Sequence, residues 1–174
     1  MTDLFICAMK ASLAPVAGLL LYASAHADSS PAAALDFELS DGRQFVRLSK
    51  LQPSPSVINF WRADCPPCVS EMPLLAAIAR EDKVRVLTVA LQRPAETLSA
   101  PAAVQSALAP PMIALHGPRE PRGLLARFGN SHGALPHTVV LDARRHVCAQ
   151  RTGEVDESWL RTALSRCIAH AGQP

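Results

Sequence analysis

The chain has 174 residues, of which 49% are hydrophobic, and its 17 basic side chains against 15 acidic ones give a formal net charge of +2. Residues 28–174 have the length of one ordinary globular domain with a full hydrophobic core. Basic and acidic residues are interspersed and aromatic residues make up only 5%. The chain lacks the basic and aromatic stripe of nucleic-acid-binding proteins, so we expect no nucleic-acid partner.

The first 27 residues have the pattern of a secretory signal peptide. Lys10 precedes an uncharged run at residues 11–25, which ends in small residues. A small-x-small site allows cleavage after Ala27 or after Ala25. The alternative is an uncleaved membrane anchor, although the apolar run is shorter than the ~20 residues that span a bilayer. We therefore expect an exported protein in the periplasm, which is membrane-anchored if the signal is not cleaved.

Beyond the signal peptide, strands and helices alternate. A leader rich in Ser, Pro and Ala at residues 28–34 is expected to be flexible. Two segments of alternating polarity, 35–39 and 44–48, flank Asp41-Gly42, which is a hairpin signal. The further predicted elements are strands at 56–61, 84–91, 112–115, 138–141 and 146–150, and helices at 66–80, 96–108 (interrupted by Pro101), 122–128 and 156–169. This order predicts one domain over residues 35–174, an α/β fold with a mixed central sheet flanked by helices and an N-terminal β-hairpin.

Cys65-Pro66-Pro67-Cys68 is the most informative motif, because it stands between a predicted strand and a predicted helix. Two thiols at this spacing can interconvert between a dithiol and a disulfide. Half of a zinc site has the same spacing. A tetrahedral zinc site, however, needs two further Cys or His ligands as a second close pair, and Cys148 and Cys167 are well separated in sequence. The motif therefore indicates redox chemistry and no metal.

Two motifs roughly seventy residues apart carry a family resemblance. The first is Phe60-Trp61-x-x-x-Cys65-Pro66-Pro67-Cys68-x-x-Glu71-Met72-Pro73, where x is any residue. The second is Gly133-Ala134-Leu135-Pro136-His137-Thr138. They resemble the active-site signature and the cis-proline loop of the TlpA/ResA/CcmG-like periplasmic thioredoxins, and the Asp41-Gly42 hairpin is similar to the N-terminal addition of that family. The resemblance covers the chain from about residue 35 to its end.

The resemblance implies the thioredoxin fold and assigns roles to the site residues. Cys65 would be the exposed nucleophile, its thiolate stabilised by the helix N-terminus, and Cys68 the shielded resolving thiol. Leu135 and a cis Pro136 would form the loop that faces substrates. The implied reaction is attack of the Cys65 thiolate on a partner disulfide, a mixed disulfide, and displacement by Cys68.

Asp64 departs from the family pattern, because relatives usually carry a tryptophan directly before the first cysteine. A carboxylate beside a forming thiolate opposes it, unless Arg62 neutralises the carboxylate. Alternatively, Asp64 points to solvent and is screened.

The proton acceptor for Cys68 is a second open point. Asn59 occupies the strand position where thioredoxin has a buried acid, and Arg93 falls near the position of a buried glutamate in ResA-like members. Glu71 and Glu96 are the remaining candidates, and a solvated helix residue is the alternative for Glu71.

Histidines lie in or beside the expected proline loop at positions 132 and 137. His137, next to Pro136, could stabilise a thiolate when protonated, because its unperturbed pKa lies near neutrality. The alternative is an exposed loop histidine.

Pro66 and Pro67 remove the first two N–H groups of the helix and Asp64 adds negative charge, so all three weaken thiolate stabilisation and favour a reductant. The resemblance implies the same: a monomeric periplasmic reductase of protein disulfides, without a cofactor, kept reduced by a membrane electron donor of DsbD/CcdA type, that serves cytochrome c maturation or copper-site assembly. Two alternatives are a disulfide-introducing oxidant and a copper-binding or delivery module with Cys65, Cys68 and His137 as soft ligands. A peroxidase is disfavoured because no Thr-x-x-Cys arrangement surrounds a cysteine.

Cleavage of the signal peptide leaves four cysteines, which in an exported chain indicate two pairs. Cys167 shares the apolar face of the last predicted helix, and Cys148 lies on a strand that this helix must cover. We expect either a structural disulfide between Cys148 and Cys167 or two separate buried thiols.

Overall fold

The described residues, 33–81 and 83–170 of the computed structural model, form one mixed sheet with helices on both faces. The expected signal peptide and residues 28–32 of the expected leader lie outside this range. The elements in chain order are β1 (Glu38–Ser40), β2 (Phe45–Arg47), the 3₁₀ turn η1 (Leu48–Lys50), β3 (Ser56–Trp61), α1 (Pro66–Ala79), β4 (Arg85–Ala90), α2 (Pro94–Thr97), α3 (Ala102–Ala107), β5 (Ile113–His116), α4 (Arg122–Arg127), β6 (His137–Leu141), β7 (Val147–Thr152) and α5 (Glu157–His170). None of the helices in these ranges is both long and apolar enough to cross a membrane.

The sheet has seven strands in the order β2-β1-β5-β4-β3-β6-β7. Strands β3, β4 and β5 run parallel to one another, whereas β6 and β7 continue the sheet antiparallel on one side. On the other side the hairpin β1–β2 is joined antiparallel to β5 through the pair Ser40 and His116. The predicted α/β fold with a mixed sheet and an N-terminal hairpin is thus confirmed.

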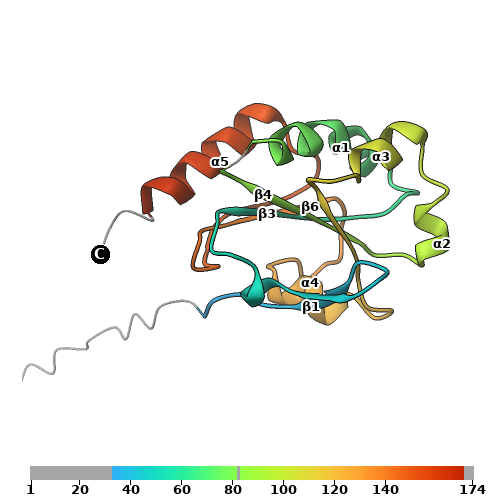
Figure 1. Cartoon of the computed structure of the whole chain (residues 1–174), viewed down its shortest axis with the longest axis horizontal. Helices are drawn as coiled ribbons and strands as arrows, with labels where there is room; N and C mark the ends of the chain where they lie inside the picture. The colour runs from blue at the N-terminus through green and yellow to red at the C-terminus, as the bar shows by residue number, and fades with distance from the viewer. Residues whose placement is uncertain (1–32, 82, 171–174) are drawn as a thin grey trace, which may run out of the picture. The chain divides into compact units, whose positions relative to one another are not determined.

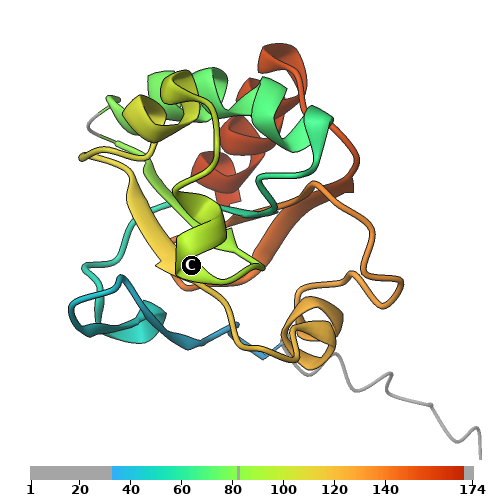
Figure 2. The ribbon, with the colours of Figure 1, turned by 90° about the vertical axis from the view of Figure 1, so that its right-hand side faces the viewer.

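Helices cover both faces of the sheet. Figures 1 and 2 show α1, α3 and α5 on one face and α4 on the other. Strand β3 lies at the centre, and all six of its residues are buried, as its uninterrupted apolar run predicts. Its alternate side chains enter different cores: Val57 and Trp61 pack under α1, whereas Ile58 and Phe60 pack towards α4.

Local sequence signals explain the element boundaries. Gly42 has φ +91°, a conformation that glycine adopts without strain, and it turns the chain between β1 and β2. Pro101 precedes α3 and separates it from α2, as expected of a residue that cannot continue a helix. Pro66 and Pro67 occupy the first turn of α1, where their missing N–H groups are not needed.

Candidate active site

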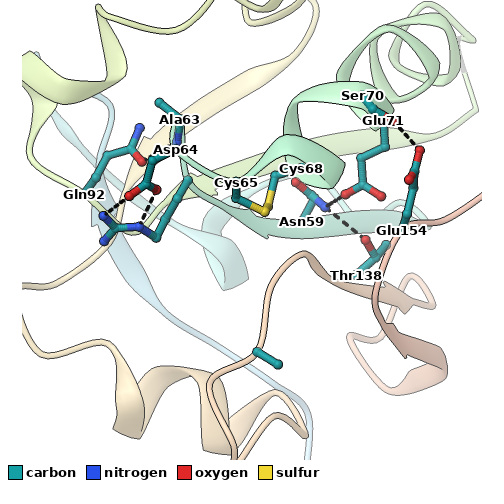
Figure 3. Close-up of a disulfide and its surroundings, with 12 residues drawn as sticks. Asn59, Ala63, Asp64, Cys65, Cys68, Ser70, Glu71, Gln92, Thr138 and Glu154 are labelled. Atoms are coloured by element: carbon teal, nitrogen blue, oxygen red, sulfur yellow. Dashed lines mark hydrogen bonds and ion pairs between the residues drawn. A yellow bond between two sulfur atoms is a disulfide. The ribbon is translucent and has the colours of Figure 1, made fainter.

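Cys65 and Cys68 lie at the N-terminus of α1 and are joined by a disulfide, with their Cα atoms 5.3 Å apart (Figure 3). Cys65 is the N-cap residue of the helix and is half-buried, whereas Cys68, one turn inside, is 0% exposed. Of the two cysteines, only Cys65 is therefore exposed to a protein partner. The arrangement suits one attacking and one shielded sulfur, because a thiol must be reachable to start exchange.

The loop before β6 holds a cis peptide bond between Leu135 and Pro136, as the family resemblance implies. Pro136 is buried, and its carbonyl oxygen accepts a hydrogen bond from the N–H of Gly153 at 2.8 Å. Half-buried Leu135 packs against the hydrophobic cluster that contains Cys68. The loop is shaped by buried Asn130, whose amide donates to Ala134 O at 2.7 Å and accepts from the N–H of Gly133 at 2.9 Å.

Asn130 was not identified from the sequence. Its only local signal is its position in a Gly-containing loop ahead of the proline, where asparagine often bonds to nearby backbone.

Asp64 is exposed and forms a two-point ion pair with Arg62 at 2.8 and 2.9 Å (Figure 3). The hydrogen bonds from Arg62 hold the pKa of Asp64 below its usual range. Arg62 also donates to Leu91 O at 3.2 Å, which fixes the guanidinium. Gln92, another residue that the sequence did not single out, accepts the N–H of Ala63 at 2.6 Å and so braces the segment that leads into Cys65. The structure thus shows both features that were expected as alternatives: Asp64 points to solvent and is paired with Arg62.

Glu71 lies on the face of α1 that packs on the sheet and is only 2% exposed. The alternative of a solvated helix residue is therefore wrong. One carboxylate oxygen accepts from Asn59 Nδ2 at 2.6 Å and the other from the N–H of Val155 at 2.9 Å. Burial raises the pKa of Glu71 to about 7, while the hydrogen bonds from Val155 and Asn59 act in the opposite direction. A carboxyl group that titrates near neutrality, three residues from Cys68 on the same helix, can exchange a proton at physiological pH.

Glu96, the other candidate acceptor, is engaged elsewhere. It accepts from the backbone N–H and the guanidinium of Arg93 in a capping contact of α2, and these bonds lower its pKa. Its charge is paired at the surface, so the structure favours Glu71.

His137 does not face the thiols, and both expectations for it were wrong. It is 1% exposed, its ring stacks on Phe60, and its nitrogens contact Thr152 Oγ1 at 2.9 Å and Phe128 O at 2.8 Å. Burial lowers its pKa. His137 is paired with Phe60 across β3 and β6, so the two side chains lie on the same face of the sheet. Phe60 packs in the core towards α4, whereas Cys68 packs in the core under α1. The imidazole and the thiols therefore lie on opposite faces of the sheet. The Cys65, Cys68 and His137 copper set is therefore not assembled, whereas His132 is exposed.

The second cysteine pair is bridged in the structure. Cys148 at the start of β7 and Cys167 near the end of α5 form a disulfide with Cα atoms 5.4 Å apart. Cys167 is 0% exposed. No group of three or more His, Cys, Asp or Glu side chains suited to a metal ion occurs among residues 33–81 and 83–170.

A cleft of about 660 Å³ lies between β1, the segment after β4 and the segment after β5. Arg62 and Gln92 line both this cleft and a smaller depression of about 200 Å³ beside Asp64. The cleft thus lies on the side of the N-terminal hairpin, and the smaller depression is lined by Asp64, the residue before Cys65.

Comparison with known proteins agrees with this geometry. The family model described as the AhpC/TSA family matches residues 31–151, which is well over half of the chain. The chain belongs to the AhpC/TSA family. No significant match was found among curated proteins.

Solved structures similar to this AhpC/TSA-family chain share its fold. An exposed lipoprotein thioredoxin of Streptococcus pneumoniae is 22% identical with a TM-score of 0.58, over 75% of this chain and 98% of that one. A thiol-disulfide isomerase of Corynebacterium glutamicum is 17% identical with a TM-score of 0.61, over 80% and 97%. A DsbF homologue of Corynebacterium diphtheriae is 20% identical with a TM-score of 0.62, over 76% and 84%. The thioredoxin fold expected from the sequence is confirmed. With its paired cysteines, this AhpC/TSA-family protein is a thiol-disulfide oxidoreductase.

The raised pKa of Glu71 gives the AhpC/TSA-family protein a measurable pH dependence. Because the folded state holds this proton up to about pH 7 and the ordinary carboxyl value is 4.5, the folded state binds more protons than the unfolded state in this interval. The contribution of Glu71 to the free energy of unfolding should therefore be full below pH 4.5 and be lost as pH rises through 7.

Urea unfolding of the oxidised wild type and of Glu71→Gln at several pH values checks this expectation. The difference between the two unfolding free energies at each pH isolates the contribution of Glu71 from that of His137. The lowered pKa of His137 changes stability in the opposite sense over part of the same pH range. Glu96→Gln, at a carboxylate paired on the surface, serves as the matched control. Parallel curves for the wild type and Glu71→Gln would contradict a raised pKa.

Proposed function

We propose that this protein is a periplasmic reductase of protein disulfides that acts in cytochrome c maturation or in copper-site assembly. The observation that carries the proposal is the half-exposed Cys65 at the N-terminus of α1, bonded to a fully buried Cys68 in the same core as the cis-proline loop. A reductase needs one sulfur that partners can reach and one that they cannot. Export rests on the signal-peptide pattern of the first 27 residues.

The reaction proceeds through two thiol-disulfide exchanges. In the reduced protein the Cys65 thiolate attacks one sulfur of the substrate disulfide, and the other substrate sulfur leaves as a thiolate that takes up a proton. Cys68 then loses its proton to Glu71 and attacks the Cys65 sulfur of the mixed disulfide, which releases the second substrate thiolate. The substrate has gained two electrons and the protein has become a disulfide. A membrane electron donor of DsbD/CcdA type returns the two electrons.

The direction of the reaction follows from weak thiolate stabilisation at the helix end. Pro66 and Pro67 have no N–H groups to offer the Cys65 sulfur, so Cys68 carries the nearest N–H of the helix. A protein that stabilises its thiolate little is a poor oxidant.

We expect a reduction potential nearer to about −270 mV, the thioredoxin value, than to the value of about −120 mV typical of DsbA. Equilibration with glutathione buffers, followed by alkylation and mass spectrometry of the Cys65–Cys68 peptide, measures it. Pro66→Ala/Pro67→Ala restores the two N–H groups and should shift the potential in the oxidising direction. A wild-type potential above roughly −160 mV would favour the disulfide-introducing oxidant instead.

The substrate class is tested with a peptide that carries an oxidised Cys-x-x-Cys-His haem-attachment motif. A reductase of cytochrome c maturation should reduce this peptide faster than it reduces insulin. Faster reduction of an oxidised copper-site assembly protein would instead indicate a role in copper-site assembly. Cys68→Ser, which cannot resolve the mixed disulfide, should trap the preferred substrate covalently on Cys65. Equal rates on all three disulfides would contradict a dedicated role.

A further inference from the structure

Asn59 places a buried amide between the redox disulfide and Glu71. It lies on β3, is 0% exposed, and donates both of its side-chain hydrogen bonds: to Glu71 Oε1 at 2.6 Å and to Thr138 Oγ1 at 3.0 Å. An ionised Glu71 carboxylate can only accept hydrogen bonds, so in this state the nitrogen of the amide faces Glu71 and its oxygen faces away. From the sequence alone, Asn59 had no assigned role beyond occupying the position of an acid.

The carbonyl oxygen of the same amide has no hydrogen-bond partner in the described part of the chain. In Figure 3 this oxygen points towards the Cys65–Cys68 disulfide, away from Glu71. The position agrees with the packing, because Glu71 stands three residues after Cys68 on α1 and Asn59 reaches Glu71 from below the same helix. A buried acceptor without a donor is unfavourable, because it has lost its hydrogen bonds to water and gained none in the protein.

We propose that Asn59 Oδ1 accepts a hydrogen bond from the Cys68 thiol whenever Cys68 is reduced, and thereby stabilises the dithiol form over the disulfide. In the disulfide neither sulfur carries a hydrogen, so the oxygen stays unpartnered. Breaking the S–S bond with two electrons and two protons places an S–H group on Cys68, and this group is the missing donor. Asn59 thus acts as a positioning residue for the resolving thiol and raises the reduction potential of the pair. The inference rests on the proposed redox function.

The alternative is that Asn59 acts only by holding Glu71. A double-mutant cycle separates the two, because Glu71→Gln removes the carboxylate charge but keeps an amide in its place. In the Glu71→Gln background, Asn59→Leu should shift the equilibrium with glutathione about tenfold towards the disulfide, which corresponds to about 30 mV for a two-electron couple. Thr138→Val is the matched control, since it removes the other partner of Nδ2 and leaves the oxygen in place; its potential should stay at the wild-type value.

The wild-type residue can also be tested without altering Asn59. In reduced Cys65→Ala, the infrared S–H stretch of Cys68, taken as the difference from Cys65→Ala/Cys68→Ser, should lie at the frequency of a hydrogen-bonded thiol. A band at the free-thiol frequency, or no effect of Asn59→Leu in the Glu71→Gln background, would overturn the proposal. Failure of the wild-type protein to exchange with glutathione at all would instead refute the proposed redox function.

Discussion

Cys65→Ser should lower the rate of disulfide reduction by about 10³-fold or more, because Cys68, the other cysteine of the motif, is buried and cannot start the exchange. In the reduced wild type, Cys65 should also be alkylated much faster than Cys68, since Cys65 is half-buried at the helix end and Cys68 is 0% exposed. Insulin reduction measures the first effect. Timed iodoacetamide labelling with peptide mass spectrometry measures the second.

Cys68→Ser is the matched variant for this prediction. It keeps the accessible thiol, so Cys65 should remain rapidly alkylated while turnover stops at the mixed disulfide. Equal labelling rates for the two wild-type cysteines would remove the assignment of roles.

Removal of the second disulfide should lower the free energy of unfolding by about 3 kcal/mol, the value expected from the chain-entropy relation for a loop of this size. Cys148 and Cys167 are 19 residues apart in sequence and join the start of β7 to the last turns of α5. Without the bridge, the unfolded chain gains the freedom of this loop. Urea unfolding of the wild type and of Cys148→Ala/Cys167→Ala gives the difference.

The single variant Cys148→Ala separates the bridge from packing. It breaks the same bond, so it should account for most of the loss, and the second substitution should add only the effect of a smaller side chain. The reduction potential should not change, because Cys148 lies at the start of β7. The proline loop lies at the other end of this strand, where His137 pairs with Thr152. Two free thiols at these positions in the exported protein, or unchanged stability, would contradict the prediction.

Much of the fold could be predicted from local patterns. The apolar run of 56–61 coincides with β3, and the double proline after Cys65 coincides with the first turn of α1, because both depend on neighbouring residues alone. Asp41-Gly42 likewise predicted the turn of the hairpin. The paired cysteines and the proline motif identified the site, since thiol chemistry requires these residue types at close spacing.

The tertiary structure decided which face each side chain of the site occupies and which partner it meets. His137 follows Pro136 directly, but the alternation of strand β6 turns it away from the thiols. Glu71 looked like a surface residue until β3 supplied Asn59 and the segment before α5 supplied the N–H of Val155. The pairing of Cys148 with Cys167 likewise depended on how α5 lies on β7. The sequence by itself determined the chemistry of this protein, because reactive groups and turn residues act at short range. Burial, pKa and hydrogen-bond partners required the fold, because they arise from contacts between segments that lie far apart in the chain.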